Sequence, residues 1–114
     1  MQAYHYTEVE ELPVEGCPGV TIRWAMAQNV EAPNFYARII AIAPGGATEY
    51  HEHPWEHQVV VLAGEGAVRD ADGELTAVGE GSCVYVESGE VHQFRNTGDE
   101  VLRFVCVIPK PEAK

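Results

Sequence analysis

Positive charge is scarce in this 114-residue chain. Seven Lys and Arg residues stand against eighteen Asp and Glu residues, which gives a net charge of −11, and the seven are scattered between Arg23 and Lys114. A protein that binds nucleic acid gathers basic residues on one face to neutralise phosphates. We therefore expect no nucleic-acid partner.

Long apolar runs are missing as well. No stretch approaches the roughly 20 apolar residues that a helix needs to cross a bilayer. The opening residues, MQAYHYTEVEEL, lack the basic start and the apolar run of a signal peptide. We expect no membrane partner and a cytoplasmic location.

Cysteine is too rare to form a disulfide framework. The three cysteines, Cys17, Cys83 and Cys106, lie far apart and form no C-x-x-C pair. An odd number cannot be fully paired, and chains of this kind keep their thiols reduced in a reducing compartment. We expect three free thiols.

Helical periodicity is also absent, and short apolar runs rich in Val, Ile, Tyr and Phe stand in its place, separated by Gly and Pro. The segment EVEELP, at residues 8–13, either begins a short helix or lies as an edge segment. Asp72-Gly73 is the strongest hairpin turn. Strands are predicted at about 19–28, 34–43, 47–53, 57–63, 66–70, 74–78, 82–87, 91–96 and 101–109. Short antiparallel strands in a chain of this length predict one all-β domain, residues 1–114, a sandwich or closed barrel with its core at about 18–109.

Alternation along the strands predicts which side chains point inward. In the last strand Phe104 and Cys106 share a face with Leu102 and Ile108, and the charge of Arg103 marks the other face as outer. The same rule applied to residues 57–63 places Val59 and Val61 on the face of His57.

Arg38 lies on the same strand face as Tyr36, Ile40 and Ile42. It either holds a substrate carboxylate or points outward or into an interface. Its charge favours the outward or interface position.

Histidine is concentrated in one place, because residues 51–57 read HEHPWEH and the chain has only five histidines. His51 and His53 project from one strand face about 6.6 Å apart, and both rings can tilt onto one ion. Four further extended residues would carry His57 roughly 13 Å away, so the chain must bend, and Pro54 favours a bend there.

The zinc-protease motif H-E-x-x-H does not fit this segment, since Trp55 or Pro54 occupies a required position. His92, on a later strand, is the better fourth ligand, and His5, near the N-terminus, is the poorer one. The alternative is a set of surface or core histidines without an ion. Three imidazoles in seven residues at strand spacing favour the metal site.

The histidine segment and a later glycine-rich segment together resemble the cupins, small β-barrels with the motifs G-x5-H-x-H-x3-4-E-x6-G and G-x5-P-x-G-x2-H-x3-N. The two motifs cover about half of the chain. Two positions depart from the pattern: Glu87 replaces Pro, and His57 replaces the ligand Glu. The matching positions are Gly45, His51, His53 and Gly64 in the first motif and Gly81, Gly89, His92 and Asn96 in the second.

The resemblance implies a double-stranded β-helix, or jelly-roll barrel. It also implies a subgroup with a four-histidine site, His51, His53, His57 and His92, that binds one manganese ion or a similar divalent ion. Imidazole also suits Fe, Ni, Zn and Cu. Cupins of this size are usually dimers, and Val60 and Leu62, opposite the inner face of their strand, need cover.

The ion and the inner strand faces predict a pocket for a small-molecule substrate, lined by Phe94, Phe104, Cys106, Val59 and Val61. Four neutral ligands leave the ion its full double charge and two open positions for water, O₂ or a chelating substrate, so no side chain is assigned as catalytic. We expect a metal-dependent oxidoreductase of the dioxygenase or oxidase type. One alternative is a metal-dependent isomerase, lyase or hydrolase, but such an enzyme needs a general base near the ion and the sequence shows no evident inward-pointing one. The other alternative is a non-catalytic module that binds a metal or small ligand.

Overall fold

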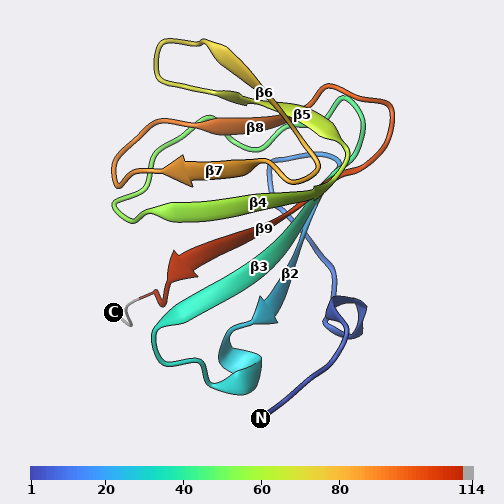
Figure 1. Ribbon diagram of the computed structural model, residues 1–114, viewed down its shortest axis with the longest axis vertical. Helices are drawn as coiled ribbons and strands as arrows, with labels where there is room; N and C mark the ends of the chain where they lie inside the picture. Colours follow the sequence, from blue (N-terminus) through green and yellow to red (C-terminus); the bar gives the residue numbers. More distant parts are fainter. Residues whose placement is uncertain (112–114) are drawn as a thin grey trace.

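The structure is a computed structural model and describes residues 1–111. Two antiparallel sheets form a jelly-roll barrel, which confirms the predicted all-β fold (Figure 1). The larger sheet has the order β1-β2-β3-β9-β4-β7 and the smaller one β6-β5-β8. The strands are β1 (Leu12–Pro13), β2 (Val20–Met26), β3 (Phe35–Ile42), β4 (His57–Ala63), β5 (Glu65–Arg69), β6 (Leu75–Gly79), β7 (Cys83–Val86), β8 (Gln93–Asn96) and β9 (Leu102–Pro109).

Two short 3-10 helices, η1 (Tyr6–Glu8) and η2 (Gln28–Val30), complete the described elements. Within residues 1–111 no helix has the length and apolar character needed to cross a membrane. In the segment EVEELP, η1 ends at Glu8, and Leu12 and Pro13 pair with β2 as an edge strand. The segment therefore does not begin a helix, and the alternative of an edge segment is the correct one.

The strand predicted at 47–53 is wrong. This segment runs beside β8 but makes only two isolated bridges, Ala47 with Arg95 and His51 with His92. Between them the side chain of Thr48 replaces part of the ladder, because its Oγ1 accepts the backbone N–H of Phe94 at 2.9 Å. A side-chain hydrogen bond of this kind competes with regular backbone pairing.

The core follows the alternation of the last strand. Leu102, Phe104, Cys106 and Ile108 are each at most 3% exposed, as the inward face of β9 requires. The ring of Phe104 packs on that of Phe94 in β8, with the centroids 4.6 Å apart, so the contact joins the two sheets. The aromatic pair thus occupies the barrel interior.

Asn96, at the end of β8, ties three segments together. Its buried side-chain amide donates to the carbonyls of Ile42 and Glu100, both at 2.8 Å, and its Oδ1 accepts the N–H of Gly98 at 2.9 Å. A buried amide is stable only when its polar atoms are hydrogen-bonded. Asn96 therefore fixes the end of β3 and the β8–β9 turn in one arrangement.

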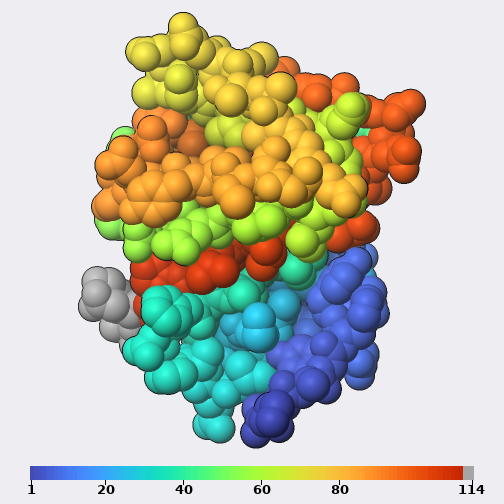
Figure 2. All heavy atoms as spheres, in the orientation of Figure 1, coloured from blue at the N-terminus to red at the C-terminus, as the bar shows by residue number. Residues whose placement is uncertain are grey.

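Part of the outer face of the larger sheet is not covered by other segments within residues 1–111. Figure 2 shows β4 and β9 as a green and a red band across the molecule, between β7 and β3, with no other segment over them. On β4 the outward side chains of Val60 and Leu62 are each 41% exposed. Exposed apolar side chains grouped on one sheet face are typical of a surface that another chain covers.

Candidate metal centre

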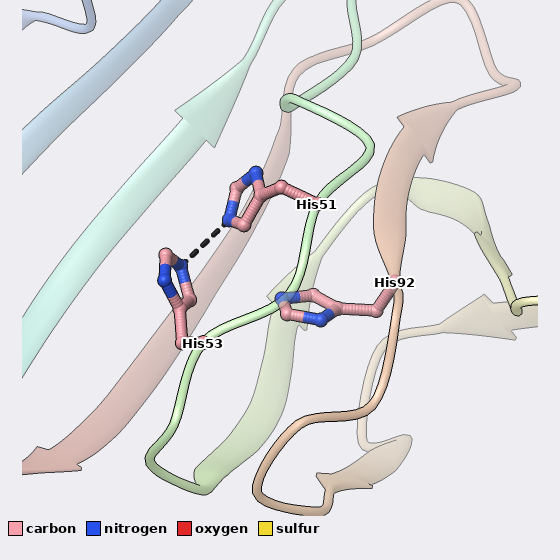
Figure 3. Close-up of side chains that lie close together, drawn as sticks. All are labelled: His51, His53 and His92. Carbon is pink, nitrogen blue, oxygen red and sulfur yellow. Dashed lines mark hydrogen bonds between the residues drawn. The ribbon is translucent and has the colours of Figure 1, made fainter.

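Three histidines converge inside the barrel. One ring nitrogen each of His51, His53 and His92 lies within 4.8 Å of the other two (Figure 3). The Nε2 atoms of His51 and His53 face each other at 2.6 Å. Two nitrogens bound at right angles to one ion would lie about 2.9 Å apart, given metal–nitrogen distances of about 2.0–2.1 Å. The pair is therefore close to the spacing that a shared ion requires.

The backbone around these histidines explains why they meet. His51 and His92 exchange two backbone hydrogen bonds, of 2.9 and 3.2 Å, which holds the two motif segments side by side. The chain then bends at Pro54 and Trp55. Ser88 donates its hydroxyl to the carbonyl of Pro54 at 2.7 Å and so anchors the bend.

Second contacts orient two of the rings. The Nδ1 of His92 lies 2.8 Å from the carbonyl of Glu90, so Nδ1 carries the proton and Nε2 keeps a free lone pair. The ring of His53 stacks on Trp55, with centroids 4.6 Å apart and planes 6° apart. Both contacts hold an imidazole in place before any ion arrives.

His57 stands beside this group but is not one of its three members. Its ring centroid lies 5.2 Å from that of His53 and 4.9 Å from that of His92. Its Nδ1 lies 3.2 Å from the Sγ of Cys106. In the described part of the chain its buried Nε2 has no hydrogen-bond partner. A buried polar atom without a partner is costly, and an ion would satisfy this one.

Burial keeps the imidazoles of His53, His57 and His92 neutral at neutral pH. It lowers the pKa of His57 to about 3, together with the positive charge of Arg38. Burial and the charge of His51 lower the pKa of His53 to about 4. Burial also lowers the pKa of His92. Neutral imidazole is the form that binds a metal ion.

A cavity of about 180 Å³ opens beside the histidines. Phe94, Phe104 and Cys106, all predicted as pocket residues, line it. Val59 and Val61 do not, because they border a separate void of about 10 Å³ deeper in the barrel. The cavity is below the roughly 300–1,000 Å³ of sites for drug-sized ligands, so it fits a smaller molecule or part of a larger one.

Arg38 also lines this cavity, so the expectation of an outward or interface position is wrong. Its Nη2 lies 2.9 Å from the Sγ of Cys106 and 3.4 Å from the Nδ1 of His57. Its guanidinium carbon lies 5.6 Å from the ring centre of Trp24. The aromatic face and the sulfur stabilise a cation on a mostly apolar strand face.

Glu49 was missed by the sequence reasoning, which found no inward carboxylate. It lines the cavity at its rim, and its Oε2 lies 3.9 Å from the Nδ1 of His51, although its side chain is 74% exposed. The available signal was its spacing, since Glu49 lies two residues before His51 and shares its side of an extended segment.

A larger hollow, of about 1120 Å³, lies between the N-terminal segment and the ends of β2, β3 and β9. Its walls include Trp24 and Tyr36 but none of the clustered histidines. Size alone therefore does not identify the site, and the smaller cavity holds the metal-ligating groups.

The donor set fits a divalent transition-metal ion. The converging groups are imidazole nitrogens with no carboxylate within the three-histidine cluster, and imidazole suits Zn, Cu, Fe and Ni. The apolar walls reduce the water around the site and strengthen electrostatic interactions there. A bound ion would leave the cavity side free for a ligand.

Comparison with known proteins gives a consistent family match. The model of the Cupin_2 family, a cupin domain, matches residues 38–108. A curated relative, the oxalate-binding protein of Thermotoga maritima, is 34% identical over 91 residues, which cover 76% of this chain and 74% of the relative. Auxin-binding protein 1 of Arabidopsis thaliana is 31% identical over 119 residues, covering 93% of this chain and 59% of that protein.

Among solved structures, the polyketide cyclase RemF of Streptomyces resistomycificus is similar over the whole of this chain and 82% of its own. Its TM-score is 0.91 and its sequence identity 29%. The match therefore extends to the N-terminal segment that precedes the region of the family model.

Proposed function

The chain belongs to the cupin family, and from that premise we propose that it is a metal-dependent enzyme that binds a small organic substrate at a divalent ion inside its barrel. One observation carries the proposal: His51, His53 and His92 bring three ring nitrogens together beside a cavity with apolar walls. Such a set holds an ion and leaves its charge available to a ligand.

We propose His57 as the fourth ligand, which would complete the four-histidine site. Its buried and unpartnered Nε2 supports this role. When Nε2 binds an ion, Nδ1 must carry the proton. The Sγ of Cys106, 3.2 Å away, can then accept a hydrogen bond from this N–H. Cys106 would then position a ligand ring rather than react.

Manganese is the metal that the family resemblance favours, with Fe, Ni, Zn and Cu as alternatives. The affinity order of nitrogen sites favours copper and zinc over manganese. The donor set is compatible with all of these ions. Elemental analysis of the purified protein distinguishes them.

For the reaction we propose Lewis-acid chemistry on a carbonyl compound, as in a cyclase, isomerase or lyase. A bound divalent ion polarises a carbonyl or enolate oxygen. Phe94 and Phe104 would exclude water, and Glu49 at the rim would accept or return a proton. The names of two relatives, an oxalate-binding protein and a polyketide cyclase, describe ligands rich in carbonyl or carboxylate oxygens.

The oxidoreductase predicted from the sequence is the second candidate. The apolar, aromatic walls beside an all-histidine site favour it. Against it stands the free thiol of Cys106, which contacts His57 and would be exposed to oxidation beside an oxygen-activating metal. A binding module without catalysis is the remaining alternative.

We also propose a homodimer, formed through the outer face of β4. The exposure of Val60 and Leu62 on this face supports it. Cytoplasmic location, a small-molecule substrate and the absence of nucleic-acid or membrane partners stay predictions from the sequence.

The test uses protein of known metal content and a panel of 1,3-diketones, β-keto acids, aromatic diols and thiols. Proton exchange at the acidic C–H positions of the diketones and keto acids is followed by NMR in D₂O, and oxygen consumption is followed with an electrode. Lewis-acid chemistry predicts deuterium incorporation without oxygen uptake. Oxygen uptake with any member would favour the oxidoreductase. Silence in both assays from fully loaded protein would reject an enzyme for these substrate classes.

A further inference from the structure

We infer that Arg38 is an anion-binding residue of the cavity and that the ligand is a small organic anion, with one oxygen on the ion and another on the guanidinium. This inference rests on the proposed metal-dependent function and specifies its substrate class. It begins from a charge inside the barrel that the protein does not neutralise.

Among residues 1–111 the guanidinium of Arg38 makes polar contacts with uncharged groups only. Its polar contacts are the sulfur of Cys106 and the Nδ1 of His57, and its Nε is buried without a partner in the described part of the chain. Among residues 1–111 Arg23 pairs with Glu11, and the Nδ1 of His51 lies 3.9 Å from Glu49, so neither contact involves Arg38. A partly buried charge is costly unless an opposite charge accompanies it.

The chain has many more carboxylates than basic groups, so the lack of a carboxylate beside Arg38 among residues 1–111 is informative about the ligand. Eighteen acidic residues are present, yet Glu49, the acidic residue in the cavity lining, is a largely exposed rim residue placed against His51. Arg23, by contrast, reaches Glu11 at 3.7 Å. No carboxylate among residues 1–111 balances Arg38, which leaves the ligand to supply the anion.

The total charge of the metal-loaded site also favours an anionic ligand. Neutral imidazoles cancel none of the double charge of a divalent ion, and Arg38 adds one more positive charge in the same cavity. Three positive charges within an apolar wall attract an anion far more strongly than a neutral molecule. A carboxylate ligand in place of one histidine would have removed part of this preference.

The surroundings of Arg38 also hold it in position. The ring of Trp24 lies under the guanidinium at 5.6 Å, and the sulfur of Cys106 takes one Nη2 hydrogen bond. The Nε is buried without a partner among residues 1–111, and a planar guanidinium can bind a carboxylate through two parallel hydrogen bonds. The cavity of about 180 Å³ limits the part of the ligand inside it to a few carbons.

The experiment measures binding of malonate and of malonamide, its neutral analogue, by calorimetry in chloride-free buffer. Wild type, Arg38→Gln, Arg38→Lys and Arg95→Gln are compared after metal loading, and the metal content of each sample is measured. Arg95 is an exposed arginine on β8 and serves as the matched control. Loss of a hydrogen-bonded charge contact should weaken malonate binding by Arg38→Gln roughly ten- to hundredfold. Malonamide binding should change less than threefold, Arg38→Lys should recover part of the loss, and Arg95→Gln should match wild type.

Unchanged malonate affinity in a folded, metal-loaded Arg38→Gln protein would overturn the inference. So would an equal loss for malonate and malonamide, since that would report altered cavity shape. If Arg38→Gln does not fold, the folded Arg38→Lys protein decides: a selective loss of malonate affinity supports the inference, and wild-type affinity for both compounds overturns it. The metal content distinguishes a failure of the anion-binding role of Arg38 from a failure of the proposed metal-dependent function. A wild-type protein that takes up no metal contradicts the metal centre and not the role of Arg38.

Discussion

His53→Ala is the sharpest test of the metal centre. The side chain supplies the Nε2 that faces His51 at 2.6 Å, so its removal deletes one nitrogen from the converging set. His53 is partly exposed, and the change therefore disturbs the core less than replacement of the buried His92 would. The main effect should fall on metal affinity.

The expected magnitude follows from the number of ligands. Structural zinc sites bind with about 10–16 kcal/mol over four ligands, so one ligand contributes about 3 kcal/mol, or roughly a hundredfold in affinity. With the ion at about 100 times its Kd, binding stabilises the wild-type fold by about 2.7 kcal/mol, and a hundredfold loss leaves about 0.4 kcal/mol. For a domain of this size, about 1 kcal/mol shifts Tm by roughly 4 °C, so the metal-induced rise should fall from about 10 °C to about 2 °C.

The assay is thermal unfolding of wild type, His53→Ala and His5→Ala, each with and without added ion, with elemental analysis of the same samples. Comparing each protein with its own metal-free form cancels the cost of lost packing. His5, an exposed residue that caps η1, is the control, and its variant should keep the full metal-induced rise. A His53→Ala protein that keeps that rise and its metal would refute the proposed centre.

Three further predictions concern stability and assembly. Asn96→Ala should lower the free energy of unfolding by about 2–4 kcal/mol in urea titrations, because buried carbonyls lose their donors; a loss below 0.5 kcal/mol would contradict its structural role. Burial lowers the pKa of His57 to about 3 and that of His53 to about 4, so the unfolded chain binds protons that the folded chain does not. The unfolding free energy of the metal-free protein should therefore decrease as the pH falls from about 6.5 toward 3, and a flat profile over that range would contradict this. Leu62→Glu on the outer face of β4 should dissociate the proposed dimer in sedimentation experiments, while Leu75→Glu, an equally apolar exposed position on β6, should not; a wild-type monomer would end the dimer proposal.

Alternation and glycine punctuation were sufficient to predict the barrel. The face that Phe104 and Cys106 share is buried as expected, because the alternation of side chains across a strand needs no tertiary information. The hairpin at Asp72-Gly73 likewise joins β5 and β6. These features are local and depend only on the sequence near them.

The position of a side chain along the barrel and its contacts with other strands were not predictable in the same way. Val59 and Val61 point inward but lie away from the histidine cavity, since strand periodicity gives a face and not a position along the barrel. Arg38 was expected outside because charge usually means exposure, yet Trp24 and Cys106 come from other strands to accommodate it. Thr48 interrupts a predicted strand through a hydrogen bond to Phe94 that becomes visible only once the segments meet.

The three hydrogen bonds of Asn96 join the end of β3 to the β8–β9 turn without using any of the clustered histidines. Replacement of a partly exposed ligand such as His53 leaves these hydrogen bonds in place. The chain is thus a suitable starting point for designing altered metal preference at His53, where a variant keeps the Asn96 contacts that join the strands.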